Sequence, residues 1–149
     1  MAEYIANQQT IALNNAIDFE ASIHCNKGYI FHNDNTGSFI LKGKTCNCFA
    51  RYQITFNANI AIPTGGAVTP IAIAISENGE TRNSSIAVFT PAAVEEFGNV
   101  TSTAIITVPK GCCFNIAIRY VDATAADPAT TPTPSIVVAN GNLVISRIA

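Results

Sequence analysis

Five cysteines carry the most distinctive chemistry of this 149-residue chain. They are Cys25, Cys46, Cys48, Cys112 and Cys113. An odd number leaves at least one thiol free, joined to another molecule or bound to a different group. Three interpretations stay open. The thiols form disulfides within or between chains, which would indicate a toughened extracellular particle; they stay reduced and pack as small apolar groups; or they bind a metal.

The spacing gives the metal interpretation little support. Cys46 and Cys48, with His24 or His32 nearby, would offer the sulfur and nitrogen ligands that zinc binds. However, the pair is Cys-x-Cys and lacks the two-residue spacer common in zinc sites. Cys112 and Cys113 are adjacent, so in a strand their side chains point to opposite faces. We therefore predict no metal site.

No set of residues in the sequence makes a convincing catalytic arrangement. A nucleophile, a base and an acid could come from Cys25 or Ser38, His32 and Asp34, but such close neighbours in sequence rarely adopt the required geometry. The glycines after Thr64 lack the Lys-Ser pair and the helix of a phosphate-binding loop. We predict that the protein is not an enzyme and that it has no catalytic residue and no cofactor.

The composition indicates contact with other copies. Charged residues are 12% of the chain, against about 25% in an average globular protein. This deficit predicts that part of the surface is covered by further subunits; the alternative is that Ala-rich apolar strands produce it within a single chain. The eight Lys and Arg are dispersed along the sequence and the net charge is −2, so no basic stripe indicates nucleic-acid binding. No apolar run approaches the roughly 20 residues that cross a bilayer, and no secretory signal is predicted at the N-terminus.

The residues 48–62 predict the central element of the fold. Apolar side chains at Ala50, Tyr52, Ile54, Phe56, Ala58 and Ile60 alternate with polar ones. A period of two indicates a long strand with one buried face. Pro63 and the two glycines after Thr64 end it.

Similar but shorter patterns predict the other strands. They cover residues 16–23, 29–32, 38–42, 68–76, 84–89, 100–108, 112–121, 135–138 and 143–148. Asn78-Gly79 and Asn140-Gly141 predict tight hairpin turns. Nine or ten strands without a convincing helix indicate an all-β sandwich or barrel. The cysteines lie near strand ends, which places them at one rim of the sandwich.

Three further segments lie outside this pattern. Residues 1–15 are polar, and we interpret them as an N-terminal arm or tether in front of a domain over 16–149. The loops 90–99 and 122–133 are candidates for partner binding, because binding sites are often built on the loops at the end of a sandwich. Glu95 and Glu96 are interpreted as a solvated loop edge.

In this order the features resemble the C1q/TNF-like jelly roll, including bacterial versions on spore-surface and phage fibres. The resemblance is carried by the central strand FARYQITFNANI, by IAIAISENGE, by AIITVPKGCCFNIAIRY and by the closing strand NLVISRIA. It implies a ten-stranded, two-sheet sandwich that assembles as a compact trimer. Relatives often have Gly-Asp before the penultimate strand where this chain has Gly111-Cys112, so no calcium or polar role is expected at that turn.

We therefore predict a non-enzymatic structural or adhesive module that forms a homotrimer on the exterior of a phage virion, spore or cell. Its partners would be itself and a surface glycan or protein receptor, without nucleic acid and without membrane insertion. The alternative is a filament or shell subunit in which the 1–15 arm adds a strand to a neighbour's sheet and cysteines crosslink the copies. The side chains expected in the trimer interface or the core are Phe49, Tyr52, Ile54, Phe56, Phe114, Ile116, Ile118 and Tyr120.

Overall fold

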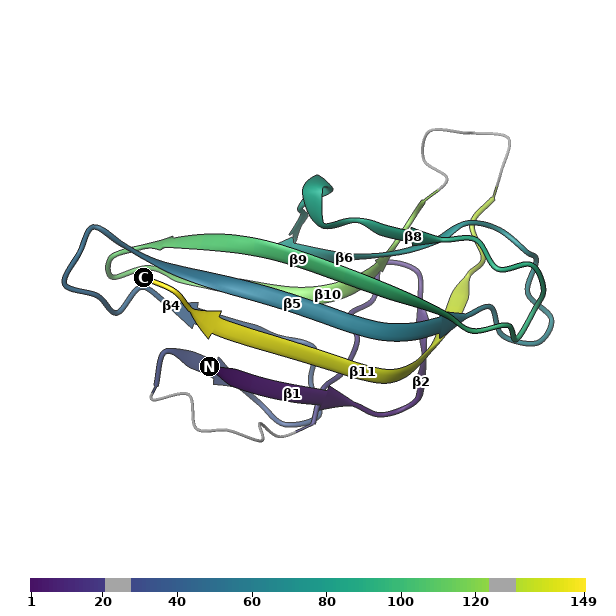
Figure 1. Ribbon diagram of the computed structural model, residues 1–149, viewed down its shortest axis with the longest axis horizontal. Helices are drawn as coiled ribbons and strands as arrows, with labels where there is room; N and C mark the ends of the chain where they lie inside the picture. Colours follow the sequence, from purple (N-terminus) through teal and green to yellow (C-terminus); the bar gives the residue numbers. More distant parts are fainter. Residues whose placement is uncertain (21–27, 124–130) are drawn as a thin grey trace.

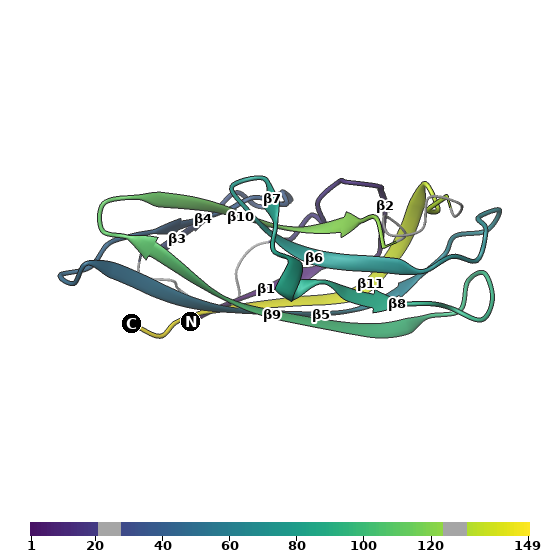
Figure 2. The ribbon, with the colours of Figure 1, turned by 90° about the horizontal axis from the view of Figure 1, so that it is seen from above.

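The computed structural model describes residues 1–20, 28–123 and 131–149. Over these ranges the chain forms two antiparallel sheets packed face to face (Figures 1 and 2). The strands are β1 (Ala2–Ala6), β2 (Gln9–Ala12), β3 (Ile30–His32), β4 (Phe39–Lys42), β5 (Phe49–Ala61), β6 (Ile71–Glu77), β7 (Glu80–Thr81), β8 (Ala87–Phe89), β9 (Gly98–Pro109), β10 (Cys113–Val121) and β11 (Ser135–Arg147), with one 3-10 turn, η1 (Asn83–Ser85). The described ranges contain no helix of the length and apolarity needed to cross a membrane.

Successive segments of the chain belong first to one sheet and then to the other, as in a jelly roll. One sheet has the order β1-β11-β5-β9, and β2 also pairs with β11. The other has the order β3-β4-β10-β6-β7, and β8 also pairs with β6. The chain therefore crosses repeatedly from one sheet to the other, and strands that are distant in sequence become neighbours. The all-β sandwich predicted from the sequence is confirmed.

The core lies between the sheets and is built on β5. The apolar side chains of β5 predicted to share one face, among them Tyr52, Ile54 and Phe56, are all fully buried, while Arg51 and Gln53 are exposed. A strand with this alternation presents one dry and one wet face. The opposite sheet completes the core with further buried side chains: Ile71, Ile73, Ile75, Ile116, Ile118 and Tyr120.

Two core tyrosines make cross-links: Tyr52 joins the two sheets, and Tyr120 joins its sheet to the segment before β11. The Tyr52 hydroxyl donates to the carbonyl oxygen of Lys42 at 2.6 Å, and the Tyr120 hydroxyl donates to that of Thr133 at 2.6 Å. Burial raises the pKa of Tyr52, against the opposing effect of Arg147. Burial, with a contribution from Asp122, raises the pKa of Tyr120 to about 12. Both phenols therefore stay neutral donors well above neutral pH.

The N-terminal segment differs from the arm expected over residues 1–15. β1 and β2 both pair with β11, so these residues belong to the five-stranded sheet. Ala2, Tyr4 and Ala6 point into the core and are buried. The Tyr4 ring packs edge-on against Phe39 at 4.7 Å between centroids. The alternation spans only five residues among polar neighbours, which makes its signal weak in the sequence.

The hairpin predicted around Asn140-Gly141 is wrong: β11 runs through it as one strand. β5 pairs with both halves, with Val138 opposite Ile60 and Leu143 opposite Phe56. The register shifts between Ala139 and Asn142 by one extra residue, which is a β-bulge. A Cβ at Gly141 would lie 2.7 Å from that of Ala6, so the bulge brings β1 too close for any larger residue.

The other turn predictions have mixed outcomes. Asn78 and Gly79, at φ 52° and 87°, form the predicted turn between β6 and β7, and β3 and β4 form the predicted hairpin. The strand expected over 84–89 is shortened to β8 because residues 83–85 form η1. The strand expected over 16–23 is reduced to isolated bridges at Ala16 and Phe19, and residues 21–23 lie outside the described residues.

Candidate functional site

Four cysteines gather at one end of the sandwich. Cys46 and Cys48 lie in the loop between β4 and β5, and Cys112 and Cys113 lie at the turn between β9 and β10; both segments are on the left of Figure 1. Backbone hydrogen bonds join them: the Gly43 N–H donates to the Cys112 carbonyl at 2.8 Å. The predicted common rim is confirmed for these four residues. Cys25 lies outside the described residues.

These four thiols are free and exposed. Over residues 1–20, 28–123 and 131–149, no three His, Cys, Asp or Glu side chains converge in a way that could hold a metal ion. Exposed thiols at one end are accessible to a thiol of another molecule, whereas buried ones would be shielded. This end therefore offers thiols that can react with another molecule.

His32 is part of the packing of the hairpin between β3 and β4. Its ring stacks on Phe39 at 4.2 Å between centroids, and its Nε2 lies 2.9 Å from the carbonyl oxygen of Thr36. Ser38, which the sequence offered as a nucleophile, accepts a hydrogen bond from the Asn115 side chain at 2.9 Å. Of the residues considered for a catalytic set, His32 and Ser38 thus serve the hairpin between β3 and β4 and its contact with β10, and Cys25 lies outside the described residues.

The outer face of the five-stranded sheet, which is the face turned away from the core, is polar and largely uncharged. Along its centre Asn99 donates to Asn57 at 2.7 Å and to Asn59 at 3.2 Å. Thr55 and Thr103 are hydrogen-bonded across the same two strands at 3.3 Å. We call these five residues the Asn/Thr ladder. Each of the five side chains makes at least one hydrogen bond within the ladder.

Apolar side chains are exposed along the β9 edge of this face, where β8 runs next to β9 (Figure 2); of these, Ile105 belongs to the outer face itself, opposite Gln53. Val88 is 57% exposed, Ile105 is 52% exposed and Ile86 is 39% exposed. Single exposed apolar residues are ordinary, but a group on one side of a molecule indicates a contact surface. We call these three residues the β8–β9 side.

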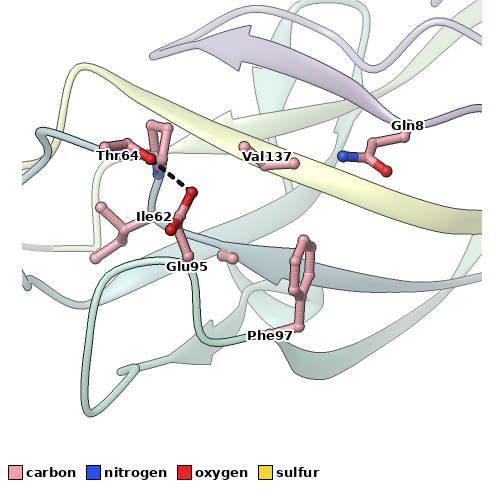
Figure 3. Close-up of a pocket in the computed structure, with 8 residues that line it drawn as sticks. Gln8, Ile62, Thr64, Glu95, Phe97 and Val137 are labelled. Carbon is pink, nitrogen blue, oxygen red and sulfur yellow. Dashed lines mark hydrogen bonds between the residues drawn. The ribbon is translucent and has the colours of Figure 1, made fainter.

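A pocket of about 340 Å³ lies at the other end of the outer face, away from the cysteines (Figure 3). Ala61 and Val137 form part of its wall. Thr64 donates a hydrogen bond of 2.5 Å to the Glu95 carboxylate beside it. The remaining lining residues are Gln8, Ile62, Pro63 and Phe97.

Glu95 is held in an unusual conformation at this pocket. Its φ is 63°, in the left-handed region that side chains other than glycine rarely adopt. Its N–H donates to the Ile62 carbonyl at 2.8 Å, which stabilises the conformation. Backbone strain of this kind is often found at functional sites. A carboxylate, an amide, a hydroxyl and an aromatic ring are together the groups that bind a polar ring with apolar C–H edges.

Comparison with known proteins was made by sequence and by structure. Neither protein-family sequence models nor curated protein sequences match the chain. Solved structures do match the chain. The globular domain of zebrafish complement 1qA aligns over 99% of this chain and 96% of its own, with a TM-score of 0.62 and 12% identity. The TNF Eiger from S. frugiperda aligns over 99% and 91%, with a TM-score of 0.66 and 8% identity. Murine APRIL aligns over 95% and 97%, with a TM-score of 0.56 and 6% identity.

The chain has a C1q/TNF-like jelly-roll fold. The C1q/TNF-like fold suggested by the strand motifs is thus confirmed across nearly the whole chain. At such low identity the similarity concerns the fold and leaves function to be argued from the surface.

In this C1q/TNF-like sandwich the eight side chains expected in the core or interface divide into two groups. Six are fully buried within the single chain: Tyr52, Ile54, Phe56, Ile116, Ile118 and Tyr120. Phe49 is 38% exposed, with the Arg51 guanidinium 4.8 Å from its ring centroid, and Phe114 is half-buried against the core. Among the eight, contact with another copy is therefore open chiefly to Phe49.

The C1q/TNF-like fold also assembles surfaces that the sequence did not indicate. The pocket in Figure 3 borders the loop 90–99 that we considered for partner binding, but it also uses Gln8 and Val137. Much of the other candidate loop, 122–133, lies outside the described residues. Gln8 and Val137 are 129 positions apart in the sequence and meet only because β1 and β2 pair with β11.

Proposed function

We propose that the protein is a non-enzymatic structural or adhesive module that forms a homotrimer on the exterior of a phage virion, spore or cell. The fold is known for trimeric assemblies. The observation that carries the proposal is the outer face of the five-stranded sheet, where β5 and β9 hold the Asn/Thr ladder and Arg51 is the one charged residue of these two strands.

The ladder lowers the free-energy cost of covering this face with another copy of the chain. Burying a polar group costs free energy unless it keeps a hydrogen bond. The Asn99 amide already donates to the Asn57 and Asn59 side-chain oxygens, and the Thr55 and Thr103 hydroxyls share a hydrogen bond. A neighbouring copy can therefore displace water here while most of these bonds persist.

The β8–β9 side supplies the apolar partner surface. Removing its exposed side chains from water is favourable by about 25 cal/mol for each Å² of apolar area. The contact of this side with the outer face of the next copy joins two different surfaces. Such a contact closes into a ring when the rotation between successive copies completes a full turn, and three copies are the number for which the fold is known.

Ile105 tests this arrangement directly. We expect the substitution Ile105→Lys to convert trimers into monomers, because a lysine ammonium would be buried without a partner in the interface. The matched control is Phe31→Lys, since Phe31 is 48% exposed but lies on β3 in the other sheet. Light scattering on size-separated protein should give a monomer for Ile105→Lys and a trimer for both the control and the unchanged chain. A trimer in all three samples would contradict the proposed contact.

The pocket in Figure 3 is our candidate for the contact with a surface glycan. Its Glu95, Thr64 and Gln8 side chains offer hydrogen bonds to sugar hydroxyls, and Phe97 offers an exposed ring for a sugar C–H face. We expect Phe97→Ala to abolish binding on a glycan array while the trimer persists. Equal binding by the two proteins would remove the pocket from the proposal.

A second candidate function is a crosslinked filament or shell subunit, favoured by the four exposed thiols at one end. The strand-donating arm has no support, because β1 and β2 are paired within their own chain. The thiol contribution is tested on denaturing gels without reductant after purification from the native source. Ladders that collapse to the single-chain band on adding reductant would favour this candidate, and a single-chain band throughout would exclude it.

A further inference from the structure

The end of the sandwich that carries the cysteines is also strongly basic. Five of the eight Lys and Arg residues of the chain lie there: Lys42, Lys44, Arg51, Lys110 and Arg147. Lys42 pairs with Cys113, the Lys110 N–H donates to the Cys48 carbonyl, and Arg147 pairs with Tyr52. The sequence disperses these residues over more than a hundred positions, and the sheets bring them together.

None of these five cations forms a side-chain ion pair with another described residue. Among residues 1–20, 28–123 and 131–149, the side-chain ion pair is the one between Arg82 and Glu77, which lies elsewhere. Lys42, Lys44, Arg51 and Lys110 are exposed, and Arg147 is half-buried. Glu95, Glu96 and Asp122 lie toward the opposite end, where β10 finishes and the loop 90–97 turns (Figure 1). The molecule therefore presents a field of one sign at the cysteine end.

A pocket of about 310 Å³ lies within this basic end. Tyr29, Lys44, Thr45, Cys46 and Arg147 line it. The Arg147 guanidinium stacks 4.3 Å from the centroid of the Tyr29 ring, and Lys44 Nζ lies 6.0 Å from the same centroid. Arg147 Nε donates to the Ala149 carbonyl at 3.1 Å, so the guanidinium is positioned while its terminal nitrogens stay available.

This arrangement is suited to an oxyanion. A positioned guanidinium donates two parallel hydrogen bonds to a carboxylate or sulfate, and an ammonium beside it adds a mobile second charge. Thr45 adds a hydroxyl to the lining. The three further cations, Lys42, Arg51 and Lys110, surround this site at the same end and would contact neighbouring charges of a polymeric ligand.

We propose that the basic end binds an acidic polysaccharide and that one of its carboxylate or sulfate groups occupies the pocket formed by Tyr29, Lys44 and Arg147. This ligand fits the charge distribution better than a nucleic acid. Duplex DNA carries one negative charge for about every 1.7 Å of its axis, and a rigid polymer of that density would also meet the acidic remainder of a chain with net charge −2. A flexible polysaccharide can contact the basic end alone.

The binding does not require the trimer, because all five cations come from one chain. It is tested with heparin as the sulfated probe, polygalacturonate as the carboxylated probe and dextran as the neutral control, in buffer of about 0.1 M salt, where exposed charges are screened beyond about 10 Å. Binding of heparin, of polygalacturonate or of both, with none of dextran, supports the proposal and identifies the preferred group. Binding of none, equal binding of dextran, or tighter binding of duplex DNA overturns it.

Substitutions locate the site. Lys44→Gln and Arg147→Gln should each weaken binding about tenfold, the loss expected for one charge-assisted hydrogen bond. Arg82→Gln removes the same charge away from the basic end and should change binding less than about twofold by the same arithmetic. Lys44 is exposed and makes no hydrogen bond to a described residue, so its variant tests the site even if Arg147→Gln fails to fold. Equal effects of Lys44→Gln and Arg82→Gln would overturn the location.

Cys46 provides a readout inside the pocket. The bound probe should slow alkylation of Cys46 by N-ethylmaleimide, because Cys46 lines the pocket. Cys112 is exposed at the same end without lining the pocket, and its alkylation should slow less. Peptide mapping by mass spectrometry gives both rates from one sample. Equal protection of the two cysteines would contradict occupation of the pocket.

Discussion

Gly43 shows how one residue sets the geometry of the cysteine end. Its N–H donates to the Cys112 carbonyl at 2.8 Å, and its own carbonyl accepts from Gly111 at 3.0 Å. A Cβ on Gly43 would lie 2.0 Å from the Pro109 carbonyl oxygen. Only a residue without a side chain allows the loop after β4 and the turn after β9 to approach this closely.

We therefore expect Gly43→Ala to lower the free energy of unfolding by about 2 kcal/mol or more, since the added methyl group meets backbone that has no room to move. Gly65→Ala is the comparison. Gly65 has φ 86° and open space around it, so the alanine should cost only the left-handed backbone penalty of about 1 kcal/mol. Urea unfolding followed by circular dichroism measures both, and an equal loss in the two variants would contradict the close approach at Gly43.

Tyr120 makes a prediction about alkaline pH. Its folded pKa is raised from 10.0 to about 12 by burial. In the unfolded chain the phenol loses its proton near pH 10, while the folded protein retains it, so stability is intact below pH 10 and falls as the pH rises toward 12. We expect Tyr120→Phe to lose about 1 kcal/mol at neutral pH with the hydrogen bond to Thr133, and to decline less steeply above pH 10. Parallel decline of the two proteins in urea titrations at several pH values would contradict the buried neutral phenol.

Single residues also show where sequence analysis succeeds and where it stops. The buried face of β5 follows from local alternation, so Tyr52, Ile54 and Phe56 were predictable. The basic end was not predictable, because Lys44 and Arg147 are far apart in the sequence. Only the packing of the two sheets brings them to the same tyrosine ring. A single charged surface residue leaves no periodic pattern in the sequence from which its spatial neighbours could be predicted.

At the scale of elements, the two Asn-Gly pairs show that a local signal depends on its neighbours. Asn78-Gly79 turns the chain because β7 is the last strand of its sheet and pairs only back onto β6. Asn140-Gly141 forms a bulge because β5 and β1 pair with β11 on both of its sides. The same dipeptide therefore reverses a strand at an edge and adds one residue to a strand in the interior.

β1 is the element whose role the sequence concealed, and Tyr4 tests it. We expect Tyr4→Ala to lower the free energy of unfolding by about 3 kcal/mol or more, the usual cost of removing a buried aromatic ring. Thr10→Ala on β2 is the control, because Thr10 is exposed; it should cost less than about 0.5 kcal/mol. Thermal unfolding measures both variants. An unchanged melting temperature for Tyr4→Ala would show that residues 1–15 are a tether after all.

At the scale of the whole molecule, the sandwich has different surfaces for different partners. The outer face and the β8–β9 side are suited to further copies, the end near Glu95 and Phe97 has a polar pocket, and the opposite end combines thiols with positive charge. Low overall charge predicted contact with other copies, but the distribution of the few charges required the fold. The remaining charges are largely confined to the ends and edges, and Arg51 is the one charged residue of β5 and β9.

The central claim is that the outer face of the five-stranded sheet is covered by other copies of the chain. The most direct test is the mass of the purified protein in dilute solution at neutral pH, measured by light scattering after size separation in the presence of reductant, so that disulfides do not contribute. The account predicts three times the mass of one chain. A particle with the mass of a single chain, stable and soluble at micromolar concentration, would contradict it.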